Sequence, residues 1–255
     1  MTLSLHGKKG LVVGIANDQS IAYGCAKAFR QAGADLAVTY LNDKARPYTK
    51  PLSDALEAEL FLPCDVREEG QIGALFDAVR DRWGRLDFLL HSIAFAPRED
   101  LHGRVVDCSR EGFDMAMNVS CHSFIRMARR AEPLMVEGGS LMTMSYYGAE
   151  KVVDRYNLMG PVKAALEASV RYLAAELAEK NIRVYALSPG PLKTRAASGI
   201  ERFDELMEQA AERAPRHALV TIEQVGSVAA FLASGAADGM TGNTVFVDNG
   251  YNVMG

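Results

Sequence analysis

The chain has 255 residues, a length that a single α/β domain can reach, and 49% of them are hydrophobic, which allows one large core. The formal net charge of −4 offers no broad attraction to nucleic acid or anionic lipid, so we expect neither nucleic-acid nor membrane binding. No long apolar stretch precedes the first charges, so we expect no signal peptide, and no apolar run reaches the length of a membrane span. The four cysteines form no CxxC pair, and we expect a cytoplasmic protein in which they are reduced.

Short apolar segments alternate with longer segments of helical spacing along the chain, without a repeat or a linker. This pattern predicts strands over residues 10–13, 36–40, 60–62, 86–91, 140–145, 182–187 and 244–247. It predicts helices over residues 20–32, 68–83, 110–136, 158–180, 201–212 and 222–234, with a short or shifted helix near Pro47 and Pro51. The strands are apolar throughout, as in sheets covered on both faces. We therefore predict one α/β domain over residues 1–255, a Rossmann-like, doubly wound parallel sheet of about seven strands with helices on both faces.

Ligands of such a sheet bind beyond the carboxyl ends of its strands, so the residues that follow each strand are the candidates for a site. The first strand runs into GIANDQSIAYG at 14–24, a turn of small residues whose backbone N–H groups can approach a pyrophosphate. It is not a GxGxxG match, so an ordinary strand–helix turn remains the alternative. No arginine directly follows the second strand, where Asp43 and Lys44 stand, and this weakly favours NADH over NADPH. After the third strand, Asp65 either accepts a hydrogen bond from adenine or caps the next helix.

Tyr156 and Lys163 lie seven residues apart near the start of a predicted helix, on one face and separated by a rise of about 10 Å. An ammonium near a phenol is expected to lower the pKa of the tyrosine, which can then stabilise a developing oxyanion. Simple packing is the alternative, because this spacing is common. Either Tyr146 or Tyr147, which directly follow the fifth strand, should face the same site, although both can instead pack against loops. The five histidines have no ligand-like spacing, and we predict no metal site.

Five segments, taken in order, resemble the enoyl-[acyl-carrier-protein] reductases, a divergent branch of the short-chain dehydrogenases. They are GIANDQSIAYG at 14–24, HSIAFAP at 91–97, the segment 145–174, SPGPLKTRAASGI at 188–200 and TGNTVFVDNGY at 241–251. The enoyl reductases place the lysine seven residues after the tyrosine, whereas ordinary short-chain dehydrogenases place it four after. A carbonyl-reducing member such as a 3-oxoacyl reductase would have a lysine at Gly160 and Asn-Asn-Ala-Gly at 91–94. A non-catalytic dinucleotide-sensing protein of the same fold would have lost Tyr156 or Lys163.

The resemblance implies an enzyme of bacterial fatty-acid elongation that reduces a trans-2-enoyl thioester carried by acyl carrier protein, with NADH as the cofactor. It also implies a homotetramer. The implied catalytic residues are Tyr146, Tyr156 and Lys163, and the implied substrate contacts are Ala96, Tyr146 and Tyr156. The implied cofactor contacts are Gly14, Ser20, Ile21, Asp65, Val66, Ile93, Lys163, Leu192, Lys193, Thr194, Arg195 and Ala196. Pro161 departs from the common pattern and is tolerable only in the first turn of its helix.

The segment 192–216 is long, charged and locally basic, and we predict a lid that orders over the substrate. Its basic residues suggest a docking face for the acidic carrier protein, and a solvated helix face is the alternative. They are Lys193, Arg195, Arg202, Arg213 and Arg216.

Overall fold

The computed structural model describes residues 3–194 and 203–254, and its described strands form one parallel sheet. The strands are β1 (Lys9–Val13), β2 (Asp35–Tyr40), β3 (Leu60–Pro63), β4 (Phe88–His91), β5 (Gly139–Met144), β6 (Ile182–Pro189) and β7 (Thr244–Val247). Their order across the sheet is β3-β2-β1-β4-β5-β6-β7, and every neighbouring pair is parallel. The predicted doubly wound, Rossmann-like sheet is therefore confirmed.

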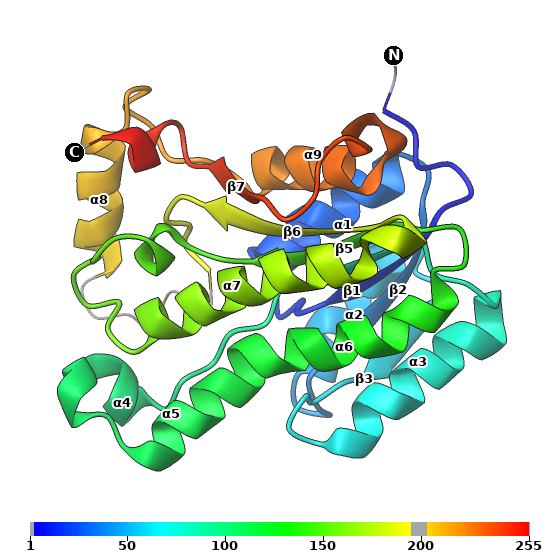
Figure 1. The fold of residues 1–255 in the computed structure, drawn as a ribbon, viewed down its shortest axis with the longest axis horizontal. Helices are drawn as coiled ribbons and strands as arrows, with labels where there is room; N and C mark the ends of the chain where they lie inside the picture. The colour runs from blue at the N-terminus through cyan, green and yellow to red at the C-terminus, as the bar shows by residue number, and fades with distance from the viewer. Residues whose placement is uncertain (1–2, 195–202, 255) are drawn as a thin grey trace.

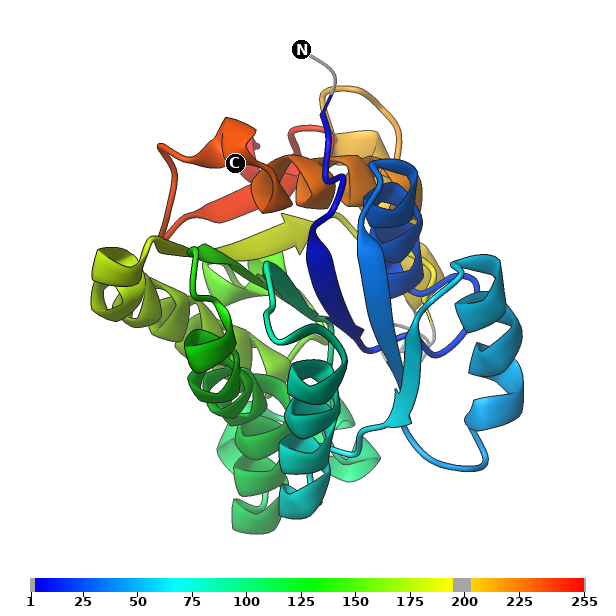
Figure 2. The same cartoon turned by 90° about the vertical axis from the view of Figure 1, so that its right-hand side faces the viewer.

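Helices cover both faces of this sheet, as Figures 1 and 2 show. They are α1 (Ile21–Gln31), α2 (Arg46–Ala55), α3 (Glu69–Trp83), α4 (Arg98–His102), α5 (Arg110–Met117), α6 (Ser123–Ala131), α7 (Met159–Leu177), α8 (Phe203–Arg213) and α9 (Ile222–Ala233). One apolar core joins the sheet to α3, α6 and α7, and a second core joins its other face to α1 and α9. Burial on both faces explains why the strands read as continuous apolar runs.

Several helix ends follow the predicted local chemistry. Gly33, just beyond α1, and Asn181, beyond the short 3-10 turn after α7, both adopt positive φ angles, as residues that end helices commonly do. Thr221 and Gln224 form a reciprocal capping box at the start of α9. Pro161 is the third residue of α7 and lies in its first turn, where no intrahelical N–H donor is lost.

The single helix predicted over 110–136 is wrong. A π-helical turn, Asn118–His122, separates α5 from α6, and α6 ends at Ala131 before a 3-10 turn that contains Pro133. The apolar spacing continues on either side of the π turn, so periodicity alone does not reveal its widened hydrogen-bonding. Pro133 lacks an N–H donor and explains the early end. The stretch between β4 and Cys108, where no helix is predicted from the sequence, contains the short helix α4.

The site-bearing edge of the molecule lies at the carboxyl ends of the strands, where Figure 1 shows α8 near the end of β6 and α4 farther away on the same side, next to α5. All four cysteines are free thiols. Within residues 3–194 and 203–254, no helix is long and apolar enough to cross a membrane.

Candidate active site

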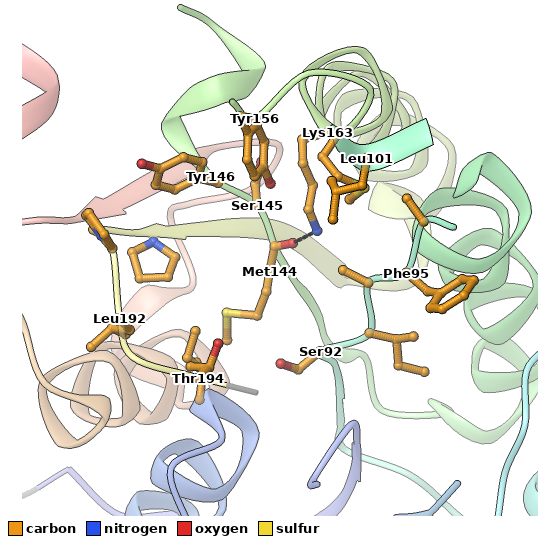
Figure 3. A pocket seen from close by; sticks show the side chains of 18 of the residues that line it. Ser92, Phe95, Leu101, Met144, Ser145, Tyr146, Tyr156, Lys163, Leu192 and Thr194 are labelled. Atoms are coloured by element: carbon orange, nitrogen blue, oxygen red, sulfur yellow. Dashed lines mark hydrogen bonds between the residues drawn. The ribbon is translucent and has the colours of Figure 1, made fainter. Parts of the chain in front are cut away.

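Two adjoining cavities lie at the carboxyl ends of the strands. The first has a volume of about 190 Å³ and contains Tyr146, Tyr156 and Lys163 in its wall (Figure 3). The second has a volume of about 320 Å³ and is lined by the turn after β1 and the residues after β3. Both are lined by Ser92–Phe95, which follow β4. The two cavities therefore meet at the middle of the sheet edge, where a Rossmann-like fold holds a dinucleotide.

The turn after β1 brings backbone close to backbone at Gly14. Gly14 has a φ of +113°, and a Cβ atom placed there would lie 2.1 Å from the carbonyl oxygen of Ser92. The Ser20 hydroxyl accepts hydrogen bonds from the N–H groups of Ala16 and Asn17, both at 3.0 Å, and so fixes the shape of the turn. Ser20 also immediately precedes α1, whose N-terminus favours an anion. Ser20 is buried beneath the turn and supports it, and pyrophosphate binding at this turn stays a prediction.

Gly14→Ala is expected to lower the free energy of unfolding by about 1–3 kcal/mol through strain at positive φ, and to weaken NADH binding. The added methyl group must push the Ser92 carbonyl away, which widens the contact between the two cavities. Thermal unfolding and fluorescence titration with NADH measure the two effects. Gly70→Ala in α3 is the matched control, because nothing lies within 4 Å of a Cβ atom there. Unchanged NADH affinity in Gly14→Ala would remove the turn from the cofactor site.

The residues after β3 form the far end of the second cavity. Asp65 is buried and accepts hydrogen bonds from Arg67 Nε at 3.0 Å and from its terminal nitrogen at 2.5 Å. These hydrogen bonds hold the pKa of Asp65 below its usual value. The alternative that Asp65 caps α3 is wrong, because the N-cap of α3 is Glu68. Asp65 and Val66 both line the cavity, as the adenine assignment requires.

The π turn holds the segment after β4 in place. Ser120 donates to the carbonyl oxygen of Phe95 at 3.0 Å and accepts from its N–H at 2.9 Å. His91 is fully buried, and its two ring nitrogens contact the hydroxyls of Thr143 at 3.0 Å and Ser123 at 2.7 Å. Burial lowers the pKa of His91 to about 3, so the ring is neutral and joins β4 to β5 and α6. These hydrogen bonds therefore hold the HSIAFAP segment, residues 91–97, in one conformation between the two cavities.

The tyrosine pair lies over the first cavity. Tyr156 is 7% exposed, and its ring meets the ring of Tyr146 edge to face with centroids 4.8 Å apart. The Tyr146 hydroxyl is buried without a hydrogen-bond partner in the part of the chain that the structure describes. Burial raises the pKa of Tyr156 and of Tyr146 above the ordinary value. The expected lowering of the Tyr156 pKa by Lys163 is therefore wrong, because desolvation of the phenolate dominates. Both phenols are protonated at neutral pH.

Lys163 is directed at the end of β5. Its side chain is 4% exposed, and its ammonium donates to the carbonyl oxygen of Met144 at 2.6 Å (Figure 3). Burial lowers the pKa of Lys163 to about 8, because the cation has lost most of its water. The ammonium keeps donors beyond the one that Met144 uses, and it lines the cavity.

The remaining predicted residues divide between the cavity and its surroundings. Ile21, Ile93, Ala96, Leu192 and Thr194 line the first cavity. Lys193 is exposed, pairs with Asp204 at 3.4 Å and borders a separate groove. Arg195 and Ala196 lie outside the described residues.

Sequence reasoning missed several residues of the wall, above all Met144 and Ser145. The rule that sites follow strand ends would have found them, since they end and follow β5. Phe95, Leu101, Met159 and Leu206 are also in the wall. Their apolar side chains are indistinguishable from core residues in the sequence.

These residues fit a nicotinamide dinucleotide. Gly14, which lies against the Ser92 carbonyl, lines the second cavity, and the Tyr146 hydroxyl, which has no partner among the described residues, offers a donor in the wall of the first. Between these points, Ser92–Phe95 line both cavities and connect them.

The sheet order, the glycine turn after β1 and the Tyr156–Lys163 pair define a dinucleotide-dependent oxidoreductase of the short-chain dehydrogenase class. A family profile described as Enoyl-(Acyl carrier protein) reductase matches residues 14–252. The chain belongs to this enoyl reductase family.

Individual relatives span the whole chain. An enoyl-[acyl-carrier-protein] reductase [NADH] of Nostoc is 48% identical over 99% of each chain. The crystal structure of the NADH enoyl reductase of Aquifex aeolicus is 46% identical, with a TM-score of 0.95 over 98% of this chain and 99% of that one. The reductase of Anaplasma phagocytophilum, solved in complex with NAD, has the same identity and TM-score over 98% of this chain and 96% of that one.

Proposed function

We propose that the protein reduces the trans-2 double bond of an enoyl thioester carried by acyl carrier protein, with NADH, in bacterial fatty-acid elongation. The observation that carries this proposal is the pair of protonated tyrosines over an apolar cavity, with Lys163 in the same wall. The names of the relatives support both the substrate class and the cofactor.

NADH, when bound, supplies the hydride that reduces the β-carbon of the enoyl chain. Tyr156 donates a hydrogen bond to the thioester oxygen as negative charge builds on it, and its raised pKa keeps that proton in place at neutral pH. Tyr146 packs against Tyr156 and restricts its ring. A proton added at the α-carbon then completes the saturated chain. Lys163 would hold the ribose hydroxyls of the cofactor, and its ammonium adds positive potential below its pKa of about 8.

The part of the second cavity that would hold the adenosine of the cofactor favours NADH over NADPH. Two arginines close to the ends of β2 and β3 already have partners, because Arg67 is paired with Asp65 and the guanidinium of Arg46 lies 6.0 Å from the ring centre of Tyr40. A 2′-phosphate would have to compete for one of them.

The reaction is tested by following loss of NADH absorbance with a trans-2-enoyl thioester, with parallel runs on NADPH and on a 3-oxoacyl thioester. Rapid enoyl-dependent oxidation of NADH is the expected result. Turnover of the 3-oxoacyl substrate alone would make the protein a carbonyl reductase, and NADH binding without turnover of either substrate would favour a sensing role.

We propose that the basic residues of segment 192–216 form the docking face for acyl carrier protein. Arg213, at the end of α8, and Arg216 are exposed, whereas the rest of α8 exposes the acidic residues Asp204, Glu205, Glu208 and Glu212. Arg213→Glu is expected to raise KM for a carrier-linked substrate by roughly two- to tenfold, because the carrier is acidic, and to leave KM for the same acyl chain on coenzyme A unchanged. Lys180→Glu, in the 3-10 turn that follows α7, is the charge-reversal control, and thermal unfolding measures the loss of its ion pair with Glu132. Equal KM values for Arg213→Glu and the unaltered enzyme would favour a solvated helix face. Arg202, which was predicted for the same surface, lies outside the described residues.

We also propose a cytoplasmic homotetramer with a lid over 192–216, on the basis of the family resemblance. Leu192, Thr194 and Leu206 of this segment already line the cavity. The apolar side chains of Phe113 and Tyr172 are exposed on α5 and α7, and an assembly of copies would cover them. Light scattering in solution measures the number of chains.

A further inference from the structure

Glu167 is a buried acidic residue that the reaction described above does not use. It lies on α7 one turn beyond Lys163 and is 5% exposed. It has no ion-pair partner among the described residues, although Arg171 lies near enough to influence it. Acidic side chains are seldom buried without a specific partner, because desolvation of the carboxylate is costly. Its hydrogen bonds should therefore have a role.

A hydroxyl group provides the hydrogen bond that the geometry shows. Ser145 donates from its Oγ to Glu167 Oε1 at 2.5 Å, and the Thr244 side chain, at the start of β7, lies near enough to lower the pKa of the carboxyl group. The carboxyl group thus joins α7 to the residue that follows β5. Ser145 is not a charged partner, so the contact is directional and depends on geometry.

Ser145 stands between the two residues through which β5 reaches the site. Its predecessor, Met144, accepts the hydrogen bond of Lys163, and its successor, Tyr146, packs against Tyr156 (Figure 3). Three consecutive residues at the strand end are therefore each held by a different side chain, and Glu167 holds the central one. Loss of that central contact frees the strand end to shift, and both neighbours shift with it.

We propose that Glu167 is a positioning residue, which fixes the Met144–Tyr146 segment through Ser145 and so sets the places of the Lys163 ammonium and the Tyr146 ring. This proposal rests on the function proposed above and adds a residue to it. Burial raises the pKa of Glu167, with Glu150 acting in the same direction and Arg171 against it; Lys163 and Tyr156 are the other titratable groups that Glu167 influences. A carboxyl oxygen accepts from Ser145 in either protonation state.

The test is a double-mutant cycle on kcat with the enoyl thioester. Glu167→Leu and Ser145→Ala are each expected to lower kcat by roughly 10- to 100-fold, since small displacements of catalytic groups have effects of that size. The double variant should be no slower than the slower single variant, because both changes break the same hydrogen bond. Glu167→Gln, which keeps an acceptor for Ser145, should stay within about threefold of the unaltered enzyme. Glu176→Leu, on the exposed side of α7, is the matched control.

Binding and stability readouts distinguish positioning from general destabilisation. NADH affinity, measured by fluorescence, should weaken in Glu167→Leu, since Lys163 loses its fixed acceptor, and should recover in Glu167→Gln. If Glu167→Leu does not fold, the test rests on Ser145→Ala, and an unaltered kcat in Ser145→Ala would overturn the proposal. Effects of the two single changes that simply multiply would also overturn it. An unaltered enzyme that does not reduce enoyl thioesters would instead reject the proposed function.

Discussion

Replacement of Tyr156 by phenylalanine is expected to lower kcat by about 100- to 1,000-fold, the usual consequence of removing one donor to a developing oxyanion. The change deletes a single oxygen from a ring that is 7% exposed and packed against Tyr146, so the cavity should keep its shape. Steady-state kinetics with a trans-2-enoyl thioester measures the loss. NADH affinity should stay within about twofold, because the hydroxyl is assigned to the thioester oxygen and not to the cofactor.

The matched change is Tyr172→Phe, which removes the same atom from an exposed position of α7 and should have no effect on kcat. Tyr146→Phe should fall between the two, because its unpartnered hydroxyl lies in the same wall but the ring contact with Tyr156 remains. Full activity in Tyr156→Phe would remove this residue from the oxyanion role. A larger loss in Tyr146→Phe than in Tyr156→Phe would exchange their assignments.

The sheet could be predicted because its strands are apolar on both faces and alternate with helical periods. Residues 244–247 were predicted to be a strand, and β7 has the same bounds. The break in the predicted helix over 110–136 could not be read in the same way. A π turn adds a residue to the local repeat without changing the residue types around it, so Asn118–His122 reads as helix. Its role in holding Phe95 depends on contacts between distant parts of the chain.

The site was predictable where a residue type and a position in the fold agree. Gly14 and Asp65 follow β1 and β3 as expected, and Lys163 lies near the start of α7. The prediction that Tyr156 shares a helix face with Lys163 is wrong, because Tyr156 lies in a turn three residues before α7, between two residues of positive φ. The structure nevertheless places all four residues in two adjoining cavities. The protonation of Tyr156 was not predictable, because desolvation depends on burial and the sequence shows only that a lysine is near. The burial and role of Glu167 were not predictable for a related reason, since a glutamate in the middle of a helix is ordinarily exposed.

Lys163→Met is expected to weaken NADH binding by roughly 10- to 100-fold, because it removes a charged donor from a buried position. The methionine keeps most of the volume of the lysine stem, so the variant should fold, and thermal unfolding checks this. Fluorescence titration with NADH gives the dissociation constant directly. An affinity that is unchanged in Lys163→Met would assign the ribose contact to another residue and leave Lys163 as a structural tie to Met144.

The same residue gives the binding a pH dependence whose sign follows from its burial. The pKa of Lys163 is lowered from 10.5 to about 8 in the folded protein, so the ammonium is present below that pH and is lost above it. Bound NADH carries negative charge and favours the ammonium, so the free enzyme must take up a proton to bind at higher pH. The dissociation constant of the unaltered enzyme should therefore rise by up to about tenfold per pH unit above pH 8, and that of Lys163→Met should not.

The same shift affects stability in the opposite direction. Between about pH 8 and about pH 10.5 the unfolded chain binds more protons at this position than the folded chain, so this lysine makes the free energy of unfolding rise with pH. Lys163→Met should remove that rise. Weaker NADH binding together with a more stable apoprotein over one pH range would identify the buried ammonium of Lys163 as the common cause, because general unfolding would move both quantities the same way.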